Sequence, residues 1–198
     1  MNKSLNISGN EQGSILVVSL IVLMMLTMIG ISITTTTSIE LQISGNEKLR
    51  KIAFYKADGG TEVGYEMLEQ NLGCADGFTN TTITGNNSAQ SVQIVNSTFW
   101  QDTSADVPTV ATRDFFFPST NPATVPRTDF TVGGNTQLSS GSAIQMLSGY
   151  EGKGKAAAAG GAFILYDMYS QHLGVNSSQS VIMVQWRHII GQEGGCNY

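Results

Sequence analysis

The chain has 198 residues, enough for one domain of ordinary size and an additional anchor. Its formal net charge is -5, and its charged fraction of 13% is low against about 25% in typical soluble domains. This balance, and the lack of a basic stripe with interleaved aromatic residues, excludes phosphate-backbone binding as a main role, so we expect no nucleic acid partner. Ser, Thr, Asn and 22 Gly take the place of charge, which is typical of surface-exposed β-rich domains.

The first predicted element is a transmembrane helix over residues 14–36. It is rich in Leu, Ile, Val and Met, and no charged residue occurs between Glu11 and Glu40. A helix of about 20 such residues spans the ~30 Å hydrocarbon core of a bilayer. A secretory signal has a shorter apolar core and a small-x-small cleavage site, which the threonines at 34–37 do not supply. The polar segment 1–13 is then a short leader, and the apolar run stays in the mature protein.

The orientation of this helix is less clear from charge. Positive-inside counting places the C-terminal side inside, because four basic residues follow the run: Lys48, Arg50, Lys51 and Lys56. We nevertheless expect the C-terminal side to be extracytoplasmic, because it contains two cysteines, Cys74 and Cys196, and is rich in Ser, Thr, Asn and Gly.

An amphipathic continuation of the helix is predicted over residues 37–72. Its apolar and small residues recur at helical spacing and mark one buried face. A continuous helix over 14–72 would be roughly 85 to 90 Å long at 1.5 Å per residue, more than a small domain needs for its own core. The alternative is a hinge at Gly45-Asn46 and a separate amphipathic helix lying on the domain. The face comprises Ile39, Ile43, Leu49, Ile52, Ala53, Ala57, Gly60, Val63, Gly64, Met67 and Leu68.

Residues 73–198 are predicted to form a β-rich extracytoplasmic head, which gives an α+β fold with an antiparallel sheet. Residues 161–170 and 180–190 are β-branched and aromatic with partial alternation, and they predict an antiparallel pair. Shorter strands or loop anchors are expected at 90–100, 114–117 and 129–132. For Phe115 to Phe117, core anchoring is favoured over an exposed adhesive patch. Three prolines, Pro118, Pro122 and Pro126, predict a loop.

Cys74 and Cys196 are the two cysteines of the chain. In an exported domain they could form a disulfide that closes a long loop between the helix end and the C-terminus. Two unrelated thiols remain the alternative.

No cofactor, metal site or catalytic residue is expected. Residues 149–155 fit G-x-x-x-x-G-K, but Ala156 stands where a P-loop needs a hydroxyl for magnesium. His172 and His188 have no metal-ligand spacing with each other or with the cysteines. No serine is singled out as a nucleophile, so a signal-anchored envelope enzyme has no positive support.

Residues 10–64 resemble the N-terminal region of the PilX family of type IV pilus minor pilins. The matching strings are Asn-Glu-Gln-Gly (10–13), Ser-Ile-Leu-Val-Val-Ser-Leu (14–20), Leu-Thr-Met-Ile-Gly (26–30), Ser-Ile-Glu-Leu-Gln-Ile-Ser-Gly-Asn-Glu-Lys-Leu-Arg (38–50) and Ile-Ala-Phe-Tyr-Lys-Ala-Asp-Gly-Gly (52–60). The resemblance covers little more than a quarter of the chain.

The resemblance implies a prepilin that is cut after Gly13 by a prepilin peptidase and N-methylated at Ser14. The implied partners are other major and minor pilins and the inner-membrane pilus assembly platform. The helices would pack together as the apolar core of a filament with the heads outward. The residues expected to pack in this way are Ile15, Leu16, Val18, Val22, Leu26, Gly30, Ile39, Ile43, Ala53, Ala57, Gly60 and Gly64.

One residue departs from the pattern of major pilins, which carry a Glu at the fifth mature position. That position is Val18 here. A buried carboxylate can pair with a neighbour's terminal amine, and Val18 cannot. This favours a minor, tip-proximal or priming subunit, although Val18 can also be an ordinary lipid-facing residue.

The expected function is that of a non-enzymatic minor pilin in the bacterial inner membrane. It would join a priming or tip complex and promote assembly of a type IV pilus. The alternatives are a type II secretion minor pseudopilin and a surface adhesion or aggregation module carried on a pilus.

Overall fold

A computed structural model describes residues 11–70, 72–73, 78, 82–83, 91–140 and 161–190. The chain divides into two compact units. We call residues 1–47 the N-terminal unit and residues 48–198 the C-terminal unit, and each is described by itself.

One helix, α1 (Glu11–Glu69), contains 59 residues and contributes to both units. Gly45 and Asn46 are helical, so one helix covers the position where the alternative prediction placed a hinge and a separate helix. The helix ends three residues before the predicted end at residue 72. In the N-terminal unit, every described side chain of α1 from residue 13 to residue 47 is exposed.

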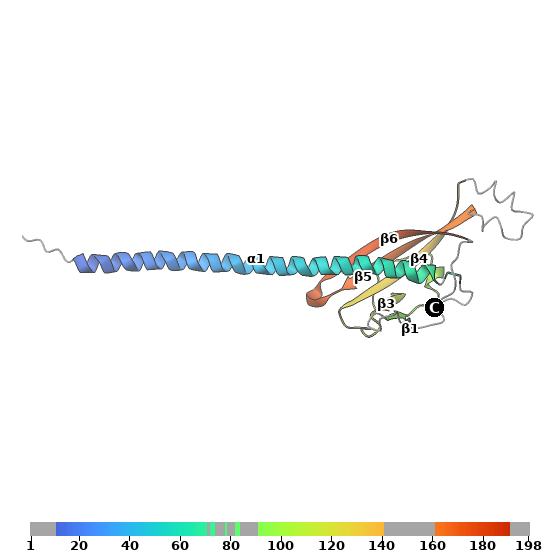
Figure 1. Ribbon diagram of the computed structural model, residues 1–198, viewed down its shortest axis with the longest axis horizontal. Coiled ribbons are helices and arrows are strands. Elements are labelled where there is room, and N and C mark those ends of the chain that lie inside the picture. Colours follow the sequence, from blue (N-terminus) through green and yellow to red (C-terminus); the bar gives the residue numbers. More distant parts are fainter. Residues whose placement is uncertain are drawn as a thin grey trace, which may run out of the picture. The chain divides into compact units, whose positions relative to one another are not determined.

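The C-terminal unit contains a six-stranded sheet in the order β1-β2-β3-β4-β5-β6, and each neighbouring pair is antiparallel (Figure 1). The predicted α+β fold, with a long apolar N-terminal helix followed by an antiparallel sheet, is therefore confirmed. The described strands are β1 (Thr82–Ile83), β2 (Val92–Ile94), β3 (Phe115–Phe117), β4 (Arg127–Leu138), β5 (Ala162–Leu173) and β6 (Gln179–Ile189), and the described 3-10 helices are η2 (Phe99–Gln101) and η4 (Val175–Ser177).

The hairpin of β5 and β6 is the antiparallel pair that the sequence predicts. Its register runs from Phe163 opposite Ile189 to Leu173 opposite Gln179. In the turn, Asn176 has a positive φ of 53°. Asn tolerates this left-handed conformation better than most residues, so the sequence at the turn suits the tight connection.

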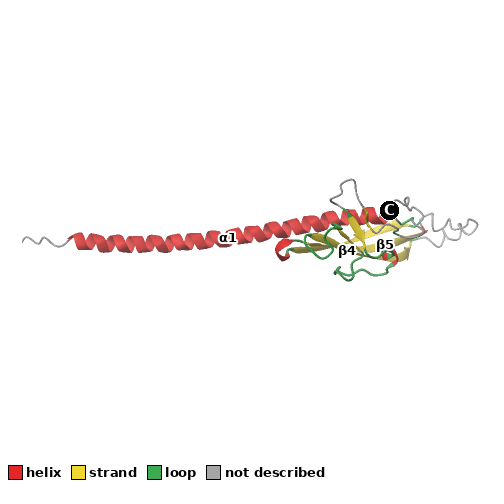
Figure 2. Cartoon of the chain, turned by 90° about the horizontal axis from the view of Figure 1, so that it is seen from below, coloured by secondary structure: helices red, strands yellow, loops and turns green. Residues whose placement is uncertain are grey.

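The core lies between the end of α1 and one face of the sheet (Figure 2). Phe115 on β3 stacks on Phe130 on β4, with ring centroids 4.5 Å apart. Phe115 and Phe116 are buried, so the predicted core anchoring by this segment is confirmed. The buried cluster comprises Met67, Leu68, Phe78, Val92, Ile94, Phe99, Phe115, Phe130, Val132, Tyr166 and Met168.

Strand β4 is buried on both of its faces over its first seven residues. Phe130 and Val132 belong to the apolar core, whereas Asp129 and Thr131 alternate with them and face the other way. The second face is covered by a loop, because the Thr131 hydroxyl donates to the Asp106 carbonyl. Strand β4 therefore separates an apolar core from a polar, loop-covered layer.

Candidate helix-packing surface and buried ion pairs

The N-terminal unit presents an unbroken apolar helix surface. The large apolar side chains from Ile15 to Ile33 are between 48% and 68% exposed. By length and composition α1 could cross a membrane: its most apolar window has a mean hydropathy of 2.7, and none of that window is buried in the chain itself. A surface of this kind is stable only against lipid or other apolar helices.

Hydroxyl side chains occur along this surface, and the helix backbone accepts their hydrogen bonds. The Ser19 hydroxyl donates to the Leu16 carbonyl at 2.8 Å, and the Thr37 hydroxyl donates to the Ile33 carbonyl at 3.0 Å. These bonds lower the cost of placing the hydroxyls in an apolar environment. Others of this kind are made by Thr27, Ser32, Thr34, Thr35 and Thr36.

In the C-terminal unit, small residues of α1 lie against the chain's own sheet. We call Ala53, Ala57, Gly60 and Gly64 the small-residue stripe, and all four are buried. A Cβ added at Gly60 would lie 2.4 Å from Ser170 Oγ, and one at Gly64 would lie 2.1 Å from Met168 Sδ. The stripe thus allows the helix backbone to approach strand β5 closely.

The twelve residues predicted to pack between helices therefore divide into two groups. Four form the small-residue stripe and are covered within this chain. The other eight are exposed: Ile15, Leu16, Val18, Val22, Leu26, Gly30, Ile39 and Ile43. Their packing against other helices stays a prediction.

Two hollows flank α1 in the C-terminal unit and share the side chains of Ile52, Lys56 and Phe117. The first has a volume of about 430 Å³ and extends to Val63 and Val92. The second has a volume of about 290 Å³ and extends to His172. The lining of both hollows is mostly apolar, so the C-terminal unit also presents apolar surface beside α1.

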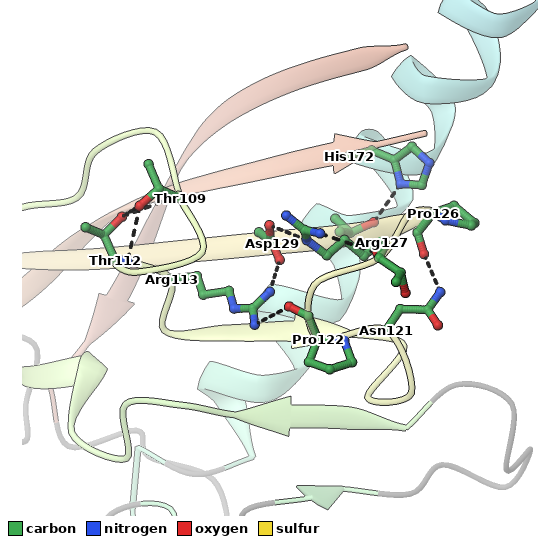
Figure 3. Close-up of polar contacts among 11 residues, drawn as sticks. Thr109, Thr112, Arg113, Asn121, Pro122, Pro126, Arg127, Asp129 and His172 are labelled. Atoms are coloured by element: carbon green, nitrogen blue, oxygen red, sulfur yellow. Dashed lines mark hydrogen bonds and ion pairs between the residues drawn. The ribbon is translucent and has the colours of Figure 1, made fainter. Parts of the chain in front are cut away.

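A buried ion-pair cluster lies in the polar layer of the sheet (Figure 3). Arg113 Nη1 donates to Asp129 Oδ1, and Arg127 Nε donates to Asp129 Oδ2, both at 2.9 Å. The Asp129 side chain is fully buried, and both arginine side chains are 6% exposed. Each carboxylate oxygen of Asp129 therefore has a cationic donor, which offsets the cost of burying its charge.

The same two arginines hold the loop between β3 and β4. Arg113 Nη2 donates to the Pro122 carbonyl at 2.7 Å, and Arg127 Nη1 donates to the Thr124 carbonyl at 3.3 Å (Figure 3). The loop closes on itself where Asn121 Nδ2 donates to the Pro126 carbonyl. The buried guanidinium groups of Arg113 and Arg127 thus hold the predicted proline loop in place through its backbone carbonyls.

A short turn positions Arg113. The Thr109 amide donates to Thr112 Oγ1 at 3.0 Å, and the Thr112 amide donates to Thr109 Oγ1 at 3.2 Å. The Arg113 amide then donates to the Thr109 carbonyl. The Arg113 guanidinium also lies over the Phe116 ring, 3.8 Å from its centroid.

Asp114 is a second buried carboxylate. Its Oδ2 accepts from the Val132 amide and its Oδ1 accepts from Asn96 Nδ2. The pKa of Asp114 is raised to about 6: burial is the largest cause, the two hydrogen bonds lower the pKa, and the nearby Asp102 makes a smaller raising contribution. This carboxyl therefore titrates close to neutral pH.

His172 lies on β5 opposite Thr128. Its Nδ1 is 2.9 Å from the Thr128 hydroxyl. Burial, with a smaller contribution from the positive charge of Lys56, lowers the pKa of His172. The ring is therefore neutral in the folded chain at neutral pH.

The remaining predicted residues fall partly outside the described structure. Gly13 and Ser14 lie exposed in α1. Cys74, Cys196 and the 149–156 segment lie outside the described residues. Within the described ranges, no group of three His, Cys, Asp or Glu side chains could hold a metal ion.

The buried contacts of Arg113, Asp114, Arg127 and Asp129 were not expected from the sequence. The available signal is that Arg113-Asp114 and Arg127-Thr-Asp129 directly adjoin aromatic residues in a chain with few charges. Charged residues within a strand or next to it, where the strand also carries buried Phe side chains, indicate buried, paired charges.

Comparison with known proteins identifies one part of the chain. Residues 12–62 match the family described as PilX N-terminal. No curated protein and no solved structure matches the chain. The matched segment contains the exposed apolar surface and the first three residues of the small-residue stripe. Over residues 12–62, just over a quarter of its length, the chain matches the PilX N-terminal family.

Proposed function

We propose that this chain is a minor pilin of the PilX type, which joins the priming or tip complex of a type IV pilus and promotes pilus assembly. The observation that carries the proposal is the exposed apolar surface from Ile15 to Ile33, within a segment that matches the PilX N-terminal family. A helix with this surface requires lipid or apolar helices around it. Pilin assembly supplies both environments in turn.

In this proposal a prepilin peptidase cuts after Gly13, and the new amino terminus, Ser14, is N-methylated. Cleavage at this point removes the leader and leaves the apolar run intact. The helix then anchors the chain in the bacterial inner membrane, with the C-terminal unit extracytoplasmic. The intrahelical bonds of its hydroxyls support this placement, because they leave no unpaired hydroxyl proton facing lipid at these positions.

The partners are other major and minor pilins and the assembly platform of the inner membrane. Val18 supports a minor rather than a bulk subunit, because its exposed side chain offers apolar contact and no carboxylate for a neighbour's amine. We further propose that the chain is not an enzyme. The described polar clusters support this view, because Arg113, Asp129 and Arg127 are engaged with one another beneath a loop.

The test places a charged side chain at the centre of the exposed apolar surface from Ile15 to Ile33. Val22→Arg places a cation that costs about 2.5 to 3.5 kcal/mol at the middle of a membrane helix. We expect this substitution to reduce the number of pili per cell and to remove the protein from sheared filaments. Val22→Leu, which preserves an apolar side chain, is the matched control and is expected to assemble normally.

Normal filament incorporation of Val22→Arg would overturn the packing claim. Immunoblots of membranes establish that each variant is made in equal amount. Loss of both variants from filaments would also contradict the proposal. It would mean that assembly requires the exact side chain at position 22, whereas the proposal requires only an apolar one.

A further inference from the structure

A third hollow lies where the η2 segment meets the second half of β4 and the first half of β5, and no described residue of α1 lines it. Its volume is about 310 Å³, at the lower end of the range of about 300 to 1,000 Å³ for small-ligand sites. Its described lining comprises Trp100, Gln101, Thr103, Gly134, Asn135, Thr136, Ile164 and Tyr166. Among these residues no side chain carries a formal charge at neutral pH.

The polar groups around this hollow are amides and hydroxyls. Gln101 supplies a side-chain amide, and Thr103 and Thr136 supply two hydroxyls, all on exposed residues. Asn135 lies between Gly134 and Thr136 on β4, so its side chain points to the other face of the strand. The amide of Gln101 both donates and accepts, and so does each hydroxyl. The half-buried Trp100 adds an aromatic surface beside them. This combination suits a neutral ligand with several hydroxyl groups.

The wall of the hollow is held in place before any ligand binds. The Gly134 amide donates to the Asp102 carbonyl at 2.6 Å, which ties the 101–103 segment to β4. A Cβ at Gly134 would lie 2.6 Å from the Tyr166 ring, so only glycine allows this approach. Tyr166 is fully buried, stacks on Trp186, and donates from its hydroxyl to the Trp100 carbonyl at 3.3 Å.

Trp100 also carries an unused donor. Its indole Nε1 is buried and has no hydrogen-bond partner among the described residues. Buried indole N–H groups usually find a partner, so this one is available to an acceptor that reaches it after a small adjustment of the ring.

We propose that this hollow binds a neutral saccharide unit, with the sugar hydroxyls on Gln101, Thr103 and Thr136 and an apolar sugar face on Trp100. The absence of charge in the described lining disfavours acidic or basic ligands, which need a compensating charge when they lose water. The inference concerns the C-terminal unit alone and does not depend on the proposed role in pilus assembly.

The test is saturation-transfer NMR on the full-length protein in a detergent without a sugar headgroup. The probes are the methyl glycosides of glucose, galactose, mannose and N-acetylglucosamine. A single sugar ring offers few contacts, so we expect at least one glycoside to bind with millimolar affinity. Thr136→Ala is expected to weaken that affinity about fivefold to tenfold, the effect of one lost hydrogen bond.

Asn135→Ala is the matched control, since it removes an exposed polar side chain from the same strand on the face opposite the hollow. It is expected to leave the affinity unchanged, and Gln101→Ala provides a second variant within the site. The proposal is overturned if no glycoside saturates at up to about 50 mM, well above a millimolar dissociation constant. Equal affinities for the Thr136 and Asn135 variants would also overturn it. Binding of N-acetylalanine amide without binding of any glycoside would indicate a peptide site and would overturn it as well.

Discussion

Ser170 on β5 donates from its side-chain oxygen to the main-chain carbonyl of Ala57 on α1, at 2.8 Å. A side chain on a strand reaches the backbone of a helix only where the helix has no bulky residue between them. The small-residue stripe provides this approach. It joins the C-terminal part of α1 to the sheet through packing and a buried hydrogen bond.

The first prediction compares two adjacent glycines in this helix. Gly60→Ala places a Cβ 2.4 Å from Ser170 Oγ, 3.1 Å from Thr128 Cγ2 and 3.2 Å from Phe130 Cζ. We expect it to lower the free energy of unfolding by about 1 to 3 kcal/mol, as overpacking does. Urea unfolding of the full-length protein, followed by near-UV circular dichroism, measures the change.

Gly59→Ala is the control for that experiment. Its added Cβ meets nothing within 4 Å, so only helix propensity changes. Ala exceeds Gly by about 1 kcal/mol in a helix interior, so this variant is expected to be as stable as the parent or more stable. An equal gain in stability from both substitutions would show that α1 does not lie as close to β5 as described.

The second prediction concerns the buried ion pairs. Asp129→Ala leaves the Arg113 and Arg127 guanidinium groups without their common carboxylate. We expect a loss of about 3 to 5 kcal/mol in the free energy of unfolding, because two buried cations remain uncompensated. Asp106→Ala, which removes an exposed carboxylate, is expected to change stability by no more than about 0.5 kcal/mol. If both substitutions changed the free energy of unfolding in urea by similar amounts, Asp129 would not form the buried ion pairs described.

The third prediction follows from the raised pKa of Asp114, which is about 6. The folded chain keeps this proton up to about that pH, whereas the unfolded chain releases it near its ordinary pKa of 3.8. The stability that this group contributes is therefore full below pH 3.8 and is lost as the pH rises to about 6. Asp114→Asn cannot titrate, so its unfolding free energy should lack this decline between about pH 4 and 6. An identical pH profile for the parent and the variant would contradict the assignment.

The fourth prediction concerns His172, whose pKa is lowered by burial and by Lys56. The folded chain releases this proton at a lower pH than the unfolded chain, whose pKa is 6.5. Its contribution to stability is therefore full above pH 6.5 and is lost as the pH falls. Removing the positive charge with Lys56→Met should raise the pKa of His172 toward its ordinary value. An NMR titration of the imidazole Cε1 proton measures both values, and a midpoint at or above 6.5 in the parent would refute the prediction.

Local patterns predicted much of this fold. The apolar run and the helical spacing beyond it predict α1, because each residue meets its helical neighbours within four positions. The β-branched and aromatic segments near the C-terminus likewise predict the hairpin of β5 and β6. The stretch 90–100 was predicted less well: β2 covers Val92–Ile94 only, and Phe99–Gln101 forms the 3-10 helix η2.

The parts that local patterns missed depend on contacts between distant residues. The small-residue stripe was recognised as a packing surface, but its partner, β5, lies more than 100 positions away in the chain. The pairing of Arg113 and Arg127 with Asp129 requires knowledge of which loop covers which face of β4. A charged residue considered alone is predicted to be exposed, because its burial is favourable only with a partner that the local sequence does not identify.

The most direct test of the central claim is the N-terminus of the protein recovered from membranes and sheared filaments, determined by intact mass and terminal sequencing. The account predicts a chain that begins at Ser14 with a methylated amine. A chain that begins at Met1 would indicate an unprocessed signal anchor. A start near residue 38 or later would mean that the apolar run is a removed signal, and the proposed pilin function would be wrong.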